Sequence, residues 1–497
     1  MNPQNWTEAI VFIIYLLFMI GIGLFFFLRT KSGGEKEYFL GGRQMGPWVS
    51  ALSAGASDMS AWVLMGLPTA VYAAGLGQIW TPVGLALGYA LSWIFEAPRL
   101  RAFSIVSDDA ITIPQYLTRR FKSKSYSLQV VCAVIFLVAY TIYAASSVKA
   151  AGTLFNTVLG DQIPWLKDHP NATMYGAAAI IIAYTFLGGF SAVCWTDFFQ
   201  GLLMLGALLI APIFALNMLN QDAIAAIAGE TQNFSNPFTS WQDIISGLGW
   251  GLGYFGMPHI IIRFLSVRSQ KSIKKSAVIG ITWTTLILIF ATLVGIFGRE
   301  MLGFDAGIKK DELVFITMVR KIFPSVISGI LLSAILAASM STADSQLLAA
   351  ASAFSSDVYK PIVRKNEASD REMLWTGRMV VLIIALLALV IASNPNAGSI
   401  MKLVSNAWGV FGAAFGPVIL LSLYWKRLNF AGALSGIITG AVVDILWLVF
   451  LSGTGVYEII PGFICGAAVA VAVSLATKAP GRDVEELFDA GVNYSGE

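Results

Sequence analysis

Three aspartates, Asp58, Asp197 and Asp344, stand inside long apolar runs of a chain in which charged residues are scarce. Placing an ionisable side chain in apolar surroundings is costly, which makes each of them a candidate for a functional role. Polar residues gather around two of them, in the stretches 53–60 and 338–345. Carboxylate, hydroxyl and carbonyl oxygens are the ligands that hard cations such as sodium prefer. We therefore expect cation chemistry at these positions.

The stretch 338–345 reads Ala-Ser-Met-Ser-Thr-Ala-Asp-Ser. Helical spacing puts Ala338, Ser341, Asp344 and Ser345 along one face, with Thr342 adjacent. The two hydroxyls of Ser341 and Thr342, with backbone carbonyls freed elsewhere, would supply several oxygen ligands to sodium. The alternative is that these hydroxyls only bond back to carbonyls of the preceding turn. Two adjacent hydroxyls and a carboxylate are more polar than that role alone requires.

The carboxylates themselves leave several interpretations open. Asp197 would reach Asp344 if their two helices touch, and two close carboxylates either share a proton or hold a cation. Asp58 would act on a cation directly, cap the start of a half-helix, or pair with a basic neighbour such as Arg43.

Aromatic residues accompany these groups. Trp250 and Tyr254 lie one turn apart, and Tyr143 lies midway along an apolar segment. Each alone is most simply a packing residue. Beside an interrupted helix they would instead form an apolar box for a small zwitterion, whose carboxylate suits a half-helix N-terminus.

The composition indicates the elements that must position these residues. Hydrophobic residues make up 57% of the 497 and charged residues 12%, with a mean hydropathy of +0.73. Such a chain is too apolar for a surface that faces water on every side, so we expect an integral membrane protein. The net charge of +3 gives no reason to expect nucleic-acid binding. An enzyme is the least favoured class, because no Ser/His, Cys/His or His-Glu-x-x-His arrangement occurs.

About thirteen segments are apolar over roughly the 20 residues that a helix needs to cross the bilayer. They begin near Glu8, Trp48, Ile79, Leu128, Met174, Ser191, Ile244, Ala277, Phe323, Met379, Met401, Phe430 and Tyr457. We predict one polytopic membrane transport domain over residues 1–478 and a short, solvated cytoplasmic tail over 479–497.

The basic residues orient these segments. Placing the N-terminus outside puts most of the 32 Lys and Arg residues on the cytoplasmic side, as the positive-inside rule requires. The predicted cytoplasmic stretches are Arg29 to Arg43, Arg99 to Lys124, Arg263 to Lys275, Lys360 to Arg378, Lys426 with Arg427, and the tail. The bias agrees with an odd number of crossings and a C-terminus inside.

Two segments are interrupted near mid-depth. The second contains the polar stretch 53–60, and the seventh contains Gly249 to Pro258, which is rich in glycine. Because the two lie five crossings apart, they run in opposite directions, and segments 2–6 and 7–11 read as two inverted five-helix units. This pattern is typical of secondary transporters, with the binding site between the breaks. Helix packing through small residues is the alternative explanation for the glycines.

Several runs resemble the sodium:solute symporter family. They are Leu40-Gly41-Gly42-Arg43, Leu52 to Ser60, Trp195-Thr196-Asp197, Gly249 to Gly256, and Ser333 to Ala338 followed by Met340-Ser341-Thr342. The resemblance covers nearly the whole chain. It implies a LeuT-type core of two inverted five-helix repeats, with broken helices 2 and 7, in the bacterial cytoplasmic (inner) membrane.

The resemblance also implies a sodium site between segments 2 and 9. Its ligands would be the main-chain carbonyls of Ala56, Met59 and Ala338 and the hydroxyls of Ser341 and Thr342. Asp58 would be the important carboxylate of the first break, and Arg43 a coupling arginine.

L-proline is the solute that the resemblance implies. It would lie near Ser60, Trp62, Tyr143, Trp250, Tyr254 and Pro258. Asp344 departs from the serine of some relatives, in a region that resembles a second sodium site formed with Asp197, Ser341 and Ser345, so the sodium stoichiometry stays open. Another small amino acid, an osmolyte or a carboxylate is the alternative solute, and a channel or a membrane sensor is the alternative class.

Overall fold

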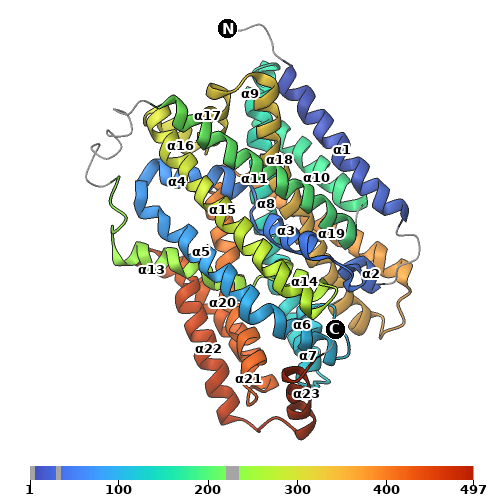
Figure 1. The fold of residues 1–497 in the computed structure, drawn as a ribbon. Coiled ribbons are helices and arrows are strands. Elements are labelled where there is room, and N and C mark those ends of the chain that lie inside the picture. Colours follow the sequence, from blue (N-terminus) through green and yellow to red (C-terminus); the bar gives the residue numbers. More distant parts are fainter. Residues whose placement is uncertain (1–5, 30–34, 188, 220–233, 496–497) are drawn as a thin grey trace.

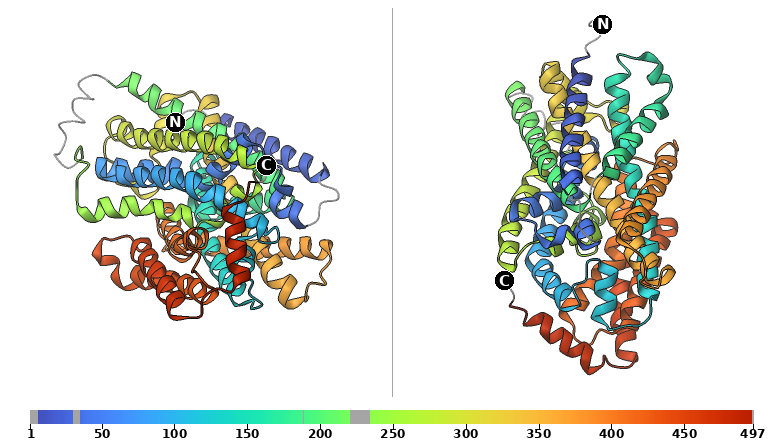
Figure 2. Two further views of the ribbon diagram at one scale, coloured as in Figure 1. Left: turned by 60° about the horizontal axis from the view of Figure 1, so that its bottom comes forward. Right: turned by 90° about the vertical axis from the view of Figure 1, so that its right-hand side faces the viewer.

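The structure is a computed structural model and describes residues 6–29, 35–187, 189–219 and 234–495. Within these ranges the chain is helical and has no strand, and one isolated parallel bridge joins Met45 to Val267. The long helices pack side by side, and the start of the first helix and the last helix lie at opposite ends of the molecule (Figure 1, Figure 2). The predicted all-helical fold class is confirmed.

The helices of the first half have the following bounds. They are α1 (Thr7–Arg29), α2 (Glu35–Leu40), α3 (Pro47–Asp58), α4 (Leu67–Ala74), α5 (Trp80–Leu91), α6 (Ala97–Val106), α7 (Ile113–Arg120), α8 (Ser127–Leu159), α9 (Pro164–Asp168), α10 (Pro170–Leu187) and α11 (Phe190–Met218). The helices of the second half are α13 (Trp241–Gly249), α14 (Pro258–Ser266), α15 (Gln270–Leu302), α16 (Ala306–Lys310), α17 (Val314–Ile322), α18 (Ser325–Phe354), α19 (Asp370–Ala392), α20 (Ile400–Tyr424), α21 (Phe430–Leu446), α22 (Ile459–Ala476) and α23 (Arg482–Val492).

Among the described residues, 10 helical stretches are long and apolar enough to cross a membrane. They correspond to ten of the thirteen predicted segments. The other three are the two interrupted segments and α10, whose apolar part, Pro170–Ala183, is shorter. A broken helix offers no long continuous run, which explains the difference for the interrupted pair. Thirteen crossings therefore stay a prediction.

The first break separates α3 from a π-helical turn, η2 (Trp62–Gly66), that leads into α4. The last bond of α3 joins the Met59 amide to the Gly55 carbonyl at 2.8 Å. The Ser60 amide then donates to the Asp58 carbonyl, at 2.8 Å, instead of reaching back four residues. The Ala56 carbonyl consequently loses the amide partner that a continuous helix would provide.

The second break lies between α13 and α14. After α13 the chain tightens into a 3-10 turn, η5 (Trp250–Phe255), and α14 begins at Pro258. Proline has no N–H, so it fits the first position of a helix, where that group has no intrahelical acceptor. A Cβ on Gly253 would lie 2.0 Å from Nε1 of Trp408, so only glycine lets the turn approach α20 this closely.

The two breaks come together in the centre of the molecule. Helix α3 contacts α14 directly and also packs against α11, α15 and α18, while η5 packs against α5 and α20. At one end the halves are hydrogen-bonded, because the Met45 amide donates to the Ser266 carbonyl and the Arg268 amide to the Met45 carbonyl, both at 3.1 Å. The two interrupted helices thus form the core of the predicted inverted repeats.

The predicted tail contains a helix, α23, which is not solvated throughout. Its Val484 and Phe488 side chains are buried, and the Phe488 ring lies 5.4 Å from that of Phe103 in α6. Arg120 of α7 donates to the Val484 carbonyl at 3.2 Å. The apolar residues of this helix recur at helical spacing and form one face, although acidic residues lie between them in the chain. This apolar face explains why the helix packs on the membrane domain. The boundary at residue 479 stays a prediction.

The close approach of α5 to η5 is testable. A Cβ on Gly88 would lie 2.2 Å from the carbonyl oxygen of Gly251, and a backbone atom yields little. Gly88→Ala should therefore lower the free energy of unfolding by about 1–3 kcal/mol, the usual cost of overpacking. Thermal unfolding of the purified protein in detergent measures it. The matched control is Gly176→Ala in α10, where nothing lies within 4 Å; equal losses in both variants would contradict the packing described.

Candidate functional site

The freed carbonyl of the first break faces α18. The Ala56 carbonyl accepts a hydrogen bond from the Ser341 hydroxyl at 2.8 Å, and the same hydroxyl lies 3.2 Å from the Ala338 carbonyl. The Thr342 hydroxyl is buried and has no hydrogen-bond partner among the described residues. Met59 lies at the break itself, as the C-cap of α3. The structure thus brings the Ala56 and Ala338 carbonyls to the Ser341 hydroxyl between α3 and α18, and the Thr342 hydroxyl next to Ser341 in the chain is still able to accept a cation.

Asp58 is the last residue of α3 and is fully buried. Its Oδ2 accepts a hydrogen bond from the Tyr254 hydroxyl at 2.5 Å, which joins the two breaks. Its Oδ1 has no partner among the described residues. The Asp58 carbonyl accepts from the indole Nε1 of Trp62 at 3.2 Å and from the Tyr143 hydroxyl at 3.3 Å. Asp58 therefore organises the first break and leaves one carboxylate oxygen available.

Arg43 does not pair with Asp58, so that alternative is wrong. Its Nε lies 2.9 Å from Oδ1 of Asp109, and its two other nitrogens donate to the Leu265 and Ala110 carbonyls at 2.7 and 2.8 Å. Burial would raise the pKa of Asp109, but the hydrogen bond from Lys36 and the positive charge of Arg43 outweigh it and hold that pKa below its ordinary value. Arg43 ties α14 to the segment between α6 and α7.

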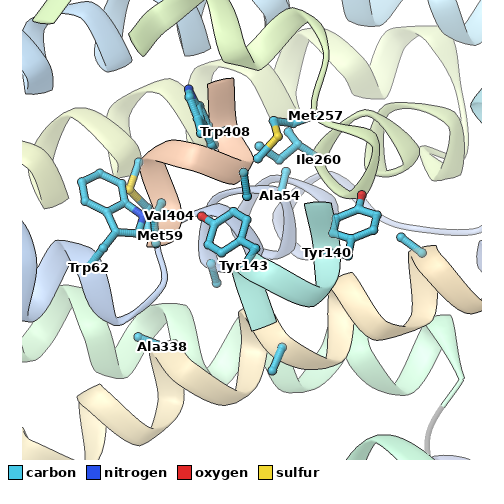
Figure 3. Close-up of a cluster of buried hydrophobic side chains, with 14 of the residues drawn as sticks. Ala54, Met59, Trp62, Tyr140, Tyr143, Met257, Ile260, Ala338, Val404 and Trp408 are labelled. Atoms are coloured by element: carbon cyan, nitrogen blue, oxygen red, sulfur yellow. The ribbon is translucent and has the colours of Figure 1, made fainter. Parts of the chain in front are cut away.

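Aromatic rings surround the space between the breaks. The rings of Trp62 and Trp250 lie 6.2 Å apart, and Tyr254 meets the Trp408 ring edge-on at 5.1 Å. Figure 3 shows Trp62, Tyr143 and Trp408 reaching the same region from three different segments. The structure therefore brings together the predicted solute residues of both breaks and of α8.

The remaining predicted solute residues flank this group. Ser60 is buried within the first break, and its hydroxyl accepts the Trp62 amide at 3.4 Å. Pro258 is buried at the start of α14. Trp408 of α20 was not predicted, although its Nε1 donates to the Trp250 carbonyl at 2.8 Å. In the sequence, a tryptophan of an ordinary apolar helix that contacts a break looks the same as one that only packs against its neighbours.

A second polar group surrounds a buried arginine that sequence reasoning assigned to a cytoplasmic stretch. Arg263 lies within α14 and is 1% exposed. Its Nη2 is 3.2 Å from Oδ2 of Asp197 in α11 and 2.5 Å from the hydroxyl of Ser345 in α18. Ser345 in turn lies 3.4 Å from Oδ1 of Asp344. Helices α11 and α18 do touch, and the Arg263 guanidinium and the Ser345 hydroxyl link Asp197 to Asp344.

Comparison with known proteins identifies the class. The model of the sodium:solute symporter family matches residues 38–440. Relatives described as the sodium/proline symporter of Staphylococcus aureus are 42% identical in strain USA300 and 41% in strain COL, each over 97% of this chain and 95% of the relative. The chain therefore belongs to the sodium:solute symporter family. It is a multi-pass membrane transporter that couples a solute to sodium, and not an enzyme.

Solved structures with similar folds support the architecture. A Na+-coupled sialic acid symporter in a substrate-bound outward-open state aligns with a TM-score of 0.77 and 20% identity, over 96% of this chain and 99% of the other. Mhp1, a nucleobase-cation-symport-1 family transporter, aligns with a TM-score of 0.56 and 14% identity, over 91% of this chain and 98% of the other. MhsT in complex with L-phenylalanine aligns with a TM-score of 0.54 and 17% identity, over 86% of this chain and 98% of the other. At these identities the likeness concerns the fold, and the predicted LeuT-type architecture is confirmed.

The hydrogen bond between the breaks is testable. Tyr254→Phe removes the donor to Oδ2 of Asp58 and leaves a buried carboxylate poorly satisfied, which should lower the free energy of unfolding by about 1–3 kcal/mol. Thermal unfolding of the purified protein measures the loss. Tyr175→Phe is the matched control, because Tyr175 is 54% exposed on α10. A Tyr254→Phe variant as stable as the control would mean that the hydroxyl does not stabilise the pair of breaks.

Proposed function

We propose that this symporter drives the uptake of L-proline with the inward sodium gradient, by alternating access across the bacterial cytoplasmic (inner) membrane. The N-terminus lies outside and the C-terminus inside, as the basic residues favour. The observation that carries the proposal is the contact of the freed Ala56 carbonyl with the Ser341 hydroxyl, next to the buried, unpartnered Thr342 hydroxyl and in the same break as Asp58.

The sodium half of the proposal rests on ligand chemistry. Sodium is a hard cation that needs several oxygen ligands, and carbonyl and hydroxyl oxygens meet between α3 and α18. The Ser341 hydroxyl now donates to the Ala56 carbonyl; with sodium bound, it would turn its oxygen toward the ion, and the buried Thr342 hydroxyl would gain the partner it lacks. Carbonyls of Ala56, Met59 and Ala338 complete the proposed set.

The proline half rests on the surroundings of the breaks. Proline is a zwitterion with an apolar ring, so it needs an aromatic surface together with groups for its two charges. Trp62, Tyr143, Trp250 and Tyr254 supply the surface. The N-terminus of α14, at Pro258, carries partial positive charge that suits a carboxylate. The sodium/proline symporters that are 42% identical to this chain add support for this solute.

Coupling follows from the position of the sodium ligands. Sodium would bridge the first break to α18 and so fix the segment that carries Ser60 and Trp62, which completes the solute site. Thermodynamic linkage makes the effect reciprocal: each ligand must tighten the binding of the other by the same factor.

Transport in proteoliposomes tests the proposal. The purified protein should accumulate labelled L-proline against its gradient only when sodium is higher outside, and it should saturate with proline. Uptake at the same rate without sodium would exclude the coupling, and equilibration without accumulation would favour a channel. If proline competes weakly against another amino acid, an osmolyte or a carboxylate, the alternative solute is correct.

The proposed ligands are testable separately. The double variant Ser341→Ala with Thr342→Ala removes two oxygens, so the sodium concentration for half-maximal uptake should rise about tenfold or more, equivalent to about 1.4 kcal/mol or more. Proline selectivity over other amino acids should stay unchanged. Thr292→Ala is the control, because the Thr292 hydroxyl only bonds back to the Leu288 carbonyl. Unaltered sodium dependence in the double variant would mean that the site is misplaced.

A further inference from the structure

Two buried carboxyl side chains meet outside the inverted repeats, on the pair of helices α21 and α22. Asp444 lies within α21 and is 0% exposed, and Glu458, directly before α22, is 8% exposed. Both reach α20 at Gly409, where a Cβ would stand 2.8 Å from Oδ1 of Asp444 and 3.3 Å from Cγ of Glu458. Because glycine has no side chain, it leaves the space in which the two acids lie side by side.

The Asp444 carboxyl group has no partner that balances a negative charge. Neither of its oxygens has a hydrogen-bond partner among the described residues. Three other titratable groups face the pair from the elements packed around it. The exposed Lys402 of α20 acts on Glu458 through its charge, Tyr457 precedes Glu458 in the chain, and Tyr143 of α8 lies behind Tyr457. None of these groups donates to Asp444, so its charge stays unmatched.

A single proton suits this pair better than a metal ion. A buried, ionised carboxylate without a partner is costly, and a second carboxylate beside it adds repulsion. Sodium would need several oxygen ligands. Gly409 of α20 and Gly462 of α22, which lie against Asp444, offer no side-chain oxygen. One proton shared by the two acids removes one charge and supplies a hydrogen bond between them.

Glu458 is connected to the proposed solute site through its neighbour in the chain. The ring of Tyr457 lies 5.2 Å from the Trp250 ring, and the Tyr457 hydroxyl donates to the Ser405 carbonyl of α20 at 2.7 Å. The Tyr457 amide donates to the Ser246 hydroxyl of α13, the half-helix before the second break, at 3.0 Å. A force on Glu458 therefore acts on Trp250 and on α13.

We propose that Asp444 and Glu458 form a binding site for a single proton, taken from the external medium, that keeps the start of α22 packed on α20 and α13. The proton reaches the pair through Glu458, which lies on the external side in the orientation proposed above. As the external pH rises, the proton returns to water and leaves two carboxylates side by side. Their repulsion moves Tyr457 away from Trp250. Only this last effect rests on the proposed function.

Infrared spectroscopy tests for the proton directly. A protonated carboxyl group has a carbonyl stretching band that a carboxylate lacks. The difference spectrum between the unmodified protein and the double variant Asp444→Asn with Glu458→Gln, at about pH 7, should contain one protonated carboxyl group and one carboxylate. Both substitutions keep the shape of the side chains. A difference spectrum that contains only carboxylate bands overturns the proposal.

Thermal unfolding separates a proton from sodium. The pair keeps its proton at a pH where the unfolded chain has lost it, so the free energy of unfolding falls as the pH rises from about 4 to the pH at which the pair ionises. Between about pH 5 and about pH 8, the unfolding temperature should therefore fall more in the unmodified protein than in the double variant. Equal falls overturn the proposal.

The same measurement is repeated with potassium replaced by sodium. Because the pair holds a proton, sodium should raise the unfolding temperature equally in the unmodified protein and in the double variant. A smaller rise in the double variant would mean that the pair binds sodium, which overturns the proposal. If the double variant does not fold, Asp444→Asn and Glu458→Gln replace it singly in all these measurements.

Uptake tests the consequence for the solute. With sodium and internal pH held constant, raising the external pH from about 7 to about 9 should raise the proline concentration for half-maximal uptake about threefold or more. Asp444→Asn and Glu458→Gln should each lose most of this dependence. Asp243→Asn is the matched control, because Asp243 is exposed on the neighbouring α13, and it should keep the dependence. The same dependence in all variants would contradict the connection to Trp250.

The two levels of proposal fail in different ways. Infrared spectra and thermal unfolding require neither proline nor transport, so an absent proton overturns this inference whatever the solute is. Absence of sodium-dependent proline uptake by the unmodified protein contradicts the proposed function, and the proton site is then decided by the infrared and unfolding measurements.

Discussion

A helix that stops inside a bilayer leaves backbone groups without partners where water cannot supply them, and the architecture of this transporter depends on how those groups are satisfied. At the first break the Ala56 carbonyl meets the Ser341 hydroxyl, at 2.8 Å. The Asp58 carbonyl accepts from Trp62 and Tyr143, and the Asp58 side chain accepts from Tyr254. The groups that stabilise the interrupted helix are thus the same groups that are suited to holding an ion and a solute.

Much of this arrangement could be predicted from local sequence. The interruptions are visible as glycine, proline and aspartate within apolar runs, and their spacing of five crossings indicates the inverted repeat. The pairing of Ser341 with the first break follows from helical periodicity once the two segments are placed together. The structure adds the contacts: which carbonyl is freed, and which hydroxyl lacks a partner.

Arg263 shows where sequence reasoning stops. It lies beside a run of basic residues, so charge patterning favours a cytoplasmic stretch. Its partner Asp197 is 66 residues away in the chain, and Ser345 is 82 residues away on the other side, so no local spacing links them. Arg43 is similar, because its partner Asp109 lies in a separate segment. Long-range ion pairs of this kind emerge only from the packing of helices.

The bridge between Met45 and Val267 has a mechanical consequence. Hydrogen bonds in both directions join the start of α3 to the end of α14, and Arg43 and Arg101 hold the Leu265 and Val267 carbonyls at 2.7 and 2.8 Å. The two half-helices on this side are therefore held together as one rigid unit, and a displacement of either is transmitted to the other. Opening this face of the molecule requires both half-helices to move together, or the hydrogen bonds between them to break together.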